Sequence, residues 1–126
     1  IYLSATAAAE AAGAKVIGVD VDQSAESATI VTSAMKELTK SVELALTSIY
    51  ANGGKWDATF AGVTATLGAK DGCVGLPVAA DSWRFAKFTS AQYDAVFAKL
   101  ADGSLVVSND IENAPAVSIC SVDYQS

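Results

Sequence analysis

The chain has 126 residues, and its 52% hydrophobic content is ample for the core of one domain. The 14 Asp and Glu residues outnumber the 8 Lys and Arg residues, so no nucleic-acid partner is expected, because phosphate binding needs clustered basic side chains. The chain has no His and only two cysteines, Cys73 and Cys120, which excludes a zinc cage of Cys and His and leaves open two free thiols or one disulfide.

The first half of the chain predicts two units of strand and helix. The alanine-rich residues 5–13 predict a helix, with Ser4 as its N-cap and a glycine as its C-terminal stop. Residues 15–19, KVIGV, predict a short, fully buried strand, and the β-branched residues 27–35 predict a second one. An amphipathic helix then begins near Leu38 and ends at the NGG of residues 52–54.

The second half has a different pattern. Residues 56–79 show β-branched alternation and several glycines, which predicts a hairpin or a strand pair that turns at the KDG of residues 70–72. Thr89 and Gln92 form a predicted capping box at the start of a helix that Gly103 ends. The buried face of this helix is expected to carry Tyr93, Val96, Phe97 and Leu100.

A short strand over residues 104–108 and another over residues 117–121 are the last predicted elements. No linker divides the chain, so we expect one domain over residues 1–126. Alternation of helices with buried strands indicates an α/β fold with a mostly parallel sheet. The chain also begins without Met inside an expected ordered element, so we expect further residues upstream.

Two acids, Asp20 and Asp22, come directly after the first predicted strand. In the simplest interpretation Asp20 ends the strand in a turn, and Asp22 or Ser24 caps the next segment of the chain. A calcium loop is disfavoured, because the EF-hand glycine and its last glutamate are both missing. No metal site or cofactor is therefore expected.

An enzymatic alternative is a phosphatase of the haloacid dehalogenase type, whose first motif resembles VIGVDVDQS. Asp20 would then be the nucleophile and Asp22 the acid/base. Such an enzyme also needs a lysine, for which Lys36 or Lys70 is available, and a later pair of acids. The nearest pair is Asp110 with Glu112, which lacks the usual opening, so we favour a protein that is not an enzyme.

The strand ends suggest a binding site instead. Ligands of open parallel α/β sheets lie beyond the carboxyl ends of the strands, where Asp20 follows one strand and Lys36 follows the next. A carboxylate that accepts and an ammonium that donates hydrogen bonds suit a pair of vicinal hydroxyls, as in a sugar or a ribose.

Three segments resemble the basic membrane protein family, the purine nucleoside receptors of ABC transporters. They are KVIGVDVDQS, TSAMKELTKSVELAL and LGAKDGCVGL, in the order and rough spacing of the family, and the resemblance covers about residues 1–107. It implies a lobe of the type I periplasmic-binding-protein fold, with helices flanking the sheet and a terminal hairpin. The chain would be most of the second, C-terminal lobe, and the first lobe would be absent.

The resemblance also implies a function and a set of binding residues. Asp20 and Lys36 would contact the ribose hydroxyls of a nucleoside, with Asp22, Gln23 and Lys70 as further candidates for the site. The partner would be an ABC permease, and the location would be extracytoplasmic, on a membrane to which an N-terminal lipid anchor outside this chain attaches the lipoprotein. A ligand-sensing regulator on the same fold is a further alternative. Trp83, Phe85, Phe88, Tyr93 and Phe97 are expected in the core or on the lobe surface.

Overall fold

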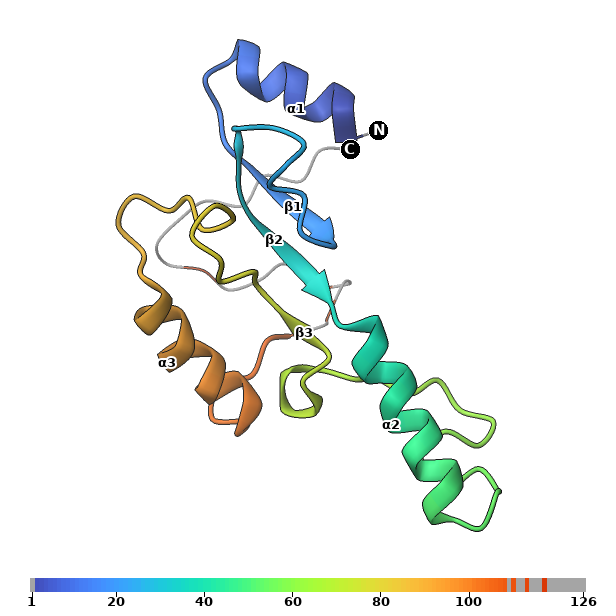
Figure 1. Cartoon of the computed structure of the whole chain (residues 1–126). Helices are drawn as coiled ribbons and strands as arrows, with labels where there is room; N and C mark the ends of the chain where they lie inside the picture. The colour runs from blue at the N-terminus through green and yellow to red at the C-terminus, as the bar shows by residue number, and fades with distance from the viewer. Residues whose placement is uncertain (1, 109, 111–112, 114–116, 118–126) are drawn as a thin grey trace.

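A three-stranded sheet organises the computed structural model, which describes residues 2–108, 110, 113 and 117 (Figure 1). The elements in chain order are α1 (Tyr2–Ala11), β1 (Val16–Asp20), β2 (Ile30–Lys36), α2 (Leu38–Ala51), the 3₁₀ turn η1 (Ala69–Asp71), β3 (Val74–Gly75) and α3 (Ser90–Ala101). The predicted α/β class, a sheet flanked by helices, is confirmed. None of the helices in the described part of the chain has the length and apolar character that crossing a membrane requires.

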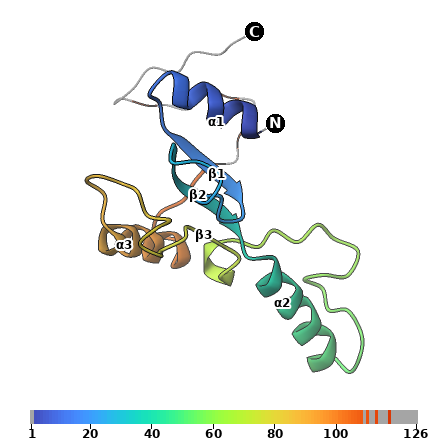
Figure 2. The same ribbon diagram turned by 45° about the horizontal axis from the view of Figure 1, so that its top comes forward.

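The strands lie in the order β1-β2-β3. β1 and β2 are parallel, with Val19 opposite Ala34 and Asp20 opposite Met35, whereas β3 is antiparallel to β2. In both views α3 lies beside β3, and α2 continues from the end of β2 away from the sheet (Figures 1 and 2). The carboxyl ends of β1 and β2 therefore meet at one edge of the sheet.

The core is small and centred on β2, where Ile30, Thr32 and Ser33 are almost fully buried. The expectation that residues 15–19 form a fully buried strand is wrong, because Ile17 is 62% exposed and Val19 is 55% exposed. The physical reason is topological: β1 is the outer strand, and its contacts within the described chain are mainly with β2.

The expected hairpin over residues 56–79 is also wrong. Its turn exists as η1, with Gly72 in the left-handed region at a φ of +67°, but residues 56–68 contain no strand. β3 pairs instead with Met35 and Lys36 of β2, and the Glu37 N–H donates to the Cys73 carbonyl at 2.8 Å. The segment after the turn therefore pairs with the free edge of β2 and not with residues 56–68, because strand formation depends on the tertiary context as well as on the local sequence pattern.

The C-terminal strands have different outcomes. Residues 104–108 form no strand, and the Leu105 N–H instead donates to the Lys99 carbonyl at 2.9 Å, so the chain folds back on the end of α3. The strand expected at residues 117–121 lies outside the described residues, apart from Val117.

The three helices form where their local signals predict them, with two corrections. α1 begins at Tyr2, so Ser4 lies inside the helix and does not cap it; Gly13 follows its end at a φ of +63°. α3 has the predicted capping box of Thr89 and Gln92. Its expected buried face is only half-buried, and Val96 is 42% exposed, because the main contact of α3 with another element of the described chain is with the short turn η1.

Candidate functional site

An ion pair joins the ends of β1 and β2. Lys36 Nζ lies 2.7 Å from Asp20 Oδ1, although the side chains remain 62% and 56% exposed. Parallel pairing produces this contact, since it places the last residues of both strands at the same edge of the sheet. An exposed ion pair adds little to stability, so a ligand can replace the contact between the two groups with hydrogen bonds of its own at little cost.

Asp20 has an unusual backbone. Its φ is +72°, and among the described residues it is the only non-glycine residue in the left-handed region. Aspartate tolerates this conformation better than most side chains do. The Val21 N–H donates to the Val19 carbonyl at 2.9 Å, so the chain reverses directly at Asp20. The carboxylate therefore projects from a tight turn at the strand end.

The loop after Asp20 is held by side chains. Asp22 Oδ1 accepts the Ser24 N–H at 3.0 Å, and Asp22 Oδ2 accepts a short hydrogen bond from the buried Ser82 hydroxyl. The Ser82 hydroxyl, followed by the Ser24 N–H, lowers the pKa of Asp22 below its ordinary value of 3.8. The structure thus places Asp22 in the same loop as Asp20 but gives it different partners.

Gln23 folds back over the strands. Its Oε1 accepts the Val19 N–H at 3.0 Å, and its own N–H donates to Ser33 Oγ at 3.0 Å. Both bonds pass close to Gly18, where an added Cβ would lie 2.5 Å from Ser33 Oγ and 2.7 Å from Gln23 Oε1. Gln23 therefore shapes the turn that presents Asp20.

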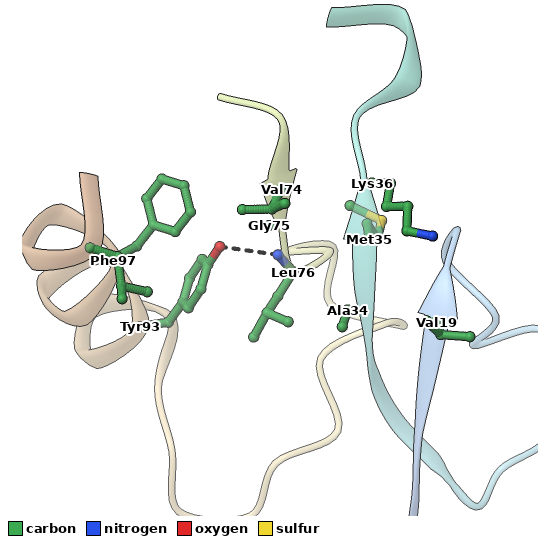
Figure 3. Close-up of a pocket in the computed structure, with 10 residues that line it drawn as sticks. Val19, Ala34, Met35, Lys36, Val74, Gly75, Leu76, Tyr93 and Phe97 are labelled. Carbon is green, nitrogen blue, oxygen red and sulfur yellow. Dashed lines mark hydrogen bonds between the residues drawn. The ribbon is translucent and has the colours of Figure 1, made fainter. Parts of the chain in front are cut away.

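A pocket of about 490 Å³ lies beside the ion pair, between the sheet and α3 (Figure 3). Its walls come from β1, β2, β3 and α3, and apart from Lys36 and the Tyr93 hydroxyl they carry no polar side chain. The lining residues are Val19, Ala34, Met35, Lys36, Val74, Gly75, Leu76, Tyr93, Phe97 and Leu100. Two aromatic residues on α3 thus line the same pocket as Lys36, which also belongs to the ion pair.

The sequence by itself does not reveal the pocket walls. The sequence predicts Tyr93 and Phe97 in the core or on the lobe surface, because an apolar stripe at helical spacing has the same pattern whether it faces a core or a pocket. The Tyr93 oxygen accepts the Leu76 N–H at 3.0 Å, which fixes the ring against β3 (Figure 3). No local signal marks that contact in the sequence.

The other sequence candidates lie apart from the pocket lining. Lys70 is in η1, is exposed, and makes no hydrogen bond or ion pair with the described residues. Cys73 is buried, and its Sγ donates to the Asp71 carbonyl at 3.6 Å. Cys120 lies outside the described residues, and the alternative of a Cys73–Cys120 disulfide therefore concerns a residue that the structure does not describe.

The acids of the phosphatase alternative have separate roles in the structure. Asp20 pairs with Lys36, whereas Asp22 bonds to Ser24 and Ser82. Of the later acid pair, Asp110 is described and Glu112 lies outside the described residues. The described part of the chain holds no group of three or more His, Cys, Asp or Glu side chains placed to bind a metal.

The chain was also compared with known proteins. Comparison with curated proteins and with solved structures returned no significant match. The family model of PnrA-like ABC transporter substrate-binding proteins, in contrast, matches residues 3–103, a range that includes both strand-end charges and the pocket walls. A match over most of the chain shows the family: this chain belongs to the PnrA-like substrate-binding proteins of ABC transporters, the basic membrane protein family.

Proposed function

We propose that this protein binds a nucleoside, holding the ribose hydroxyls with Asp20 and Lys36 and the base in the adjoining apolar pocket. The observation that carries the proposal is the ion pair of 2.7 Å at the pocket margin. It presents an acceptor and a donor side by side, which matches the two hydroxyls of a vicinal diol.

Family membership supplies the coarser role. The family consists of substrate-binding proteins of ABC transporters, so the ligand is a small molecule, the partner is a permease, and the location is outside the cytoplasm. It is a family of binding proteins, not of enzymes. Nucleoside specificity, with a preference for purines, is the finer step that we propose, and delivery to the permease would follow binding.

The pocket supports the base-binding half of the proposal. Its volume of about 490 Å³ falls within the range of small-molecule sites. A nucleobase is flat and aromatic, and the rings of Tyr93 and Phe97 offer it stacking surface. Lys36 belongs both to the pocket lining and to the ion pair, so the hydroxyl-binding groups and the apolar walls are contiguous.

The remaining candidates have lesser parts in the proposal. Gln23 shapes the turn, since both its side chain and its backbone N–H bond to the sheet. Lys70 is proposed only as a cation that reaches the ligand after a conformational closure, because it is absent from the pocket lining. We further propose that the chain is most of the second lobe of a two-lobed lipoprotein whose first lobe completes the site.

Calorimetry on the full-length protein tests the proposal with inosine, adenosine and guanosine. We expect binding, and we expect Asp20→Ala to weaken it by roughly 2 to 4 kcal/mol, since a charge-assisted contact is lost. Glu10→Gln is the control, because it removes an exposed carboxylate on α1 and should leave the affinity unchanged.

Two results would contradict this function. Equal affinity of the wild-type protein for inosine and 2′,3′-dideoxyinosine would remove the diol from recognition. No heat with any nucleoside, together with magnesium-dependent release of phosphate from a model ester, would instead favour the phosphatase alternative.

A further inference from the structure

We propose that Asp22 and Ser82 are positioning residues that hold the Asp20 carboxylate in its ligand-binding orientation without contacting the ligand themselves. The inference rests on the proposed function, because it assumes that Asp20 binds the ribose hydroxyls. It assigns a role to a serine that no sequence motif singled out.

The need for such a device arises from the position of Asp20. The residue is more than half exposed, lies in the left-handed region, and occupies the reversal between β1 and a loop. A residue in a sparsely populated backbone region stays there only where the surrounding structure holds it. The ion pair with Lys36 is too exposed to supply that restraint.

Asp22 connects this loop to a distant part of the chain. Its Oδ1 makes the local bond to the Ser24 N–H, an interaction that a turn alone would form. Its Oδ2 accepts from the Ser82 hydroxyl, 60 residues away in the sequence, and the Ser82 oxygen also lies 3.1 Å from the Ser24 hydroxyl. Each carboxylate oxygen of Asp22 thus has a hydrogen-bond partner within the protein, which is the arrangement expected of a positioning residue.

The burial of Ser82 makes the connection rigid. Ser82 is only 2% exposed, and its backbone N–H donates to the Ala79 carbonyl at 3.0 Å, so the backbone that carries the hydroxyl is held in place. A hydroxyl donating to a carboxylate is a charge-assisted bond, stronger than a neutral one. At Asp22, two residues after Asp20, the loop is therefore hydrogen-bonded to the buried Ser82.

A second set of hydrogen bonds holds the other end of the same loop, where it enters β2. Arg84 Nη1 donates to the Ser27 carbonyl at 2.9 Å and to the Ile30 carbonyl at 3.1 Å, and the Arg84 N–H donates to the Val31 carbonyl at 2.9 Å. One short segment, residues 82–84, thus holds the loop between β1 and β2 at both ends. A binding group that is already held in its bound conformation loses less conformational entropy when the ligand binds, so the entropic cost of binding is smaller.

A double-mutant cycle in the full-length protein tests the inference by calorimetry. Ser82→Ala is expected to raise the Kd for inosine about tenfold, or ~1.4 kcal/mol, while leaving the Kd for 2′,3′-dideoxyinosine unchanged. In the Asp20→Ala background Ser82→Ala should have no further effect, because its influence passes through Asp20. Ser4→Ala, which removes an exposed hydroxyl on α1, is the matched control and should change neither Kd.

Asp22→Ala provides a second variant in case Ser82→Ala fails to fold, since the Asp22 side chain is exposed, and it should give the same pattern. If both variants bind inosine as the wild type does, or if Ser82→Ala and Asp20→Ala are additive, the positioning role is overturned while the proposed function stands. If the wild type itself does not distinguish inosine from its dideoxy analogue, the proposed function has failed, and the positioning role fails with it.

Discussion

At the scale of single residues, Gly18 shows why the site has its shape. β1 passes Ser33 of β2 so closely that an added Cβ would lie 2.5 Å from Ser33 Oγ, and the Gln23 side chain crosses the same space. The absence of a side chain at Gly18 therefore lets Gln23 reach the Val19 N–H at 3.0 Å. The turn that presents Asp20 depends on this close approach.

Gly18→Ala is expected to destabilise the protein by about 1–3 kcal/mol, because the new methyl group forces Ser33 and Gln23 aside in a packed region. Urea unfolding followed by circular dichroism measures this. Gly68→Ala is the matched control, since its φ of −126° suits alanine and nothing lies within 4 Å of its added Cβ. Equal losses in the two variants would show that the crowding at Gly18 has no role.

The lowered pKa of Asp22 predicts a dependence of stability on pH. A carboxyl whose pKa is lowered on folding stabilises the protein above its ordinary pKa of 3.8, and this stabilisation is lost as the pH falls through the lowered value. The difference in free energy of unfolding between the wild type and Asp22→Asn should hold from neutral pH to about pH 5 and shrink below pH 3.8. A difference that persists unchanged at the acid end would mean that Ser82 does not favour the charged carboxylate.

At the scale of elements, α3 illustrates a structure that local chemistry specifies. Thr89 Oγ1 accepts the Gln92 N–H at 3.3 Å, and Gln92 Oε1 accepts the Thr89 N–H at 2.9 Å. Both groups lie within one helical turn, so their spacing in the sequence was sufficient to predict them. β3 is the opposite case, because its two residues form a strand only where the edge of β2 receives them.

Thr89→Ala is expected to cost about 1 kcal/mol, because the first turn of α3 then loses its N-cap acceptor. Thr89→Ser retains the hydroxyl and should cost much less. Chemical denaturation of the two variants provides the measurement. A Thr89→Ser variant that is as unstable as Thr89→Ala would attribute the loss to the methyl group and not to the cap.

At the scale of the whole molecule, an aromatic cluster joins α3 to the segment that carries Ser82. The centroid of the Trp83 ring lies 5.1 Å from that of Phe85, 5.7 Å from that of Phe88 and 5.6 Å from that of Tyr93. Trp83 Nε1 also donates to the Phe88 carbonyl at 2.8 Å. Trp83, the sequence neighbour of the buried Ser82, thus packs against Tyr93, which lines the pocket. Within the described chain this cluster adds aromatic packing outside the small core around β2.

Trp83→Ala should lower the free energy of unfolding by roughly 2 to 4 kcal/mol, since it removes a half-buried ring together with its hydrogen bond. Trp56→Ala is the comparison, because that side chain is 56% exposed and its loss should cost less than about 1 kcal/mol. Urea unfolding distinguishes them. Similar losses for the two tryptophans would show that the cluster does not support the fold.

The sequence by itself determined the features that depend on neighbouring residues. These are the α/β class, the positions of the three helices, the capping box of Thr89 and the placement of Asp20 and Lys36 at strand ends. Each rests on side-chain type, periodicity or a hydrogen bond within a few residues, and such interactions are encoded locally. The resemblance to the basic membrane protein family also came from the sequence and agrees with the family match.

Only the tertiary structure decided which distant groups meet. It brought Lys36 to 2.7 Å from Asp20, joined Asp22 to Ser82, paired β3 with β2, and turned Tyr93 and Phe97 into pocket walls. It also left Ile17 and Val19 exposed, although their sequence indicated burial. The physical reason is that these outcomes depend on strand order, on register and on which edge receives a segment, and none of these is specified by interactions between neighbouring residues.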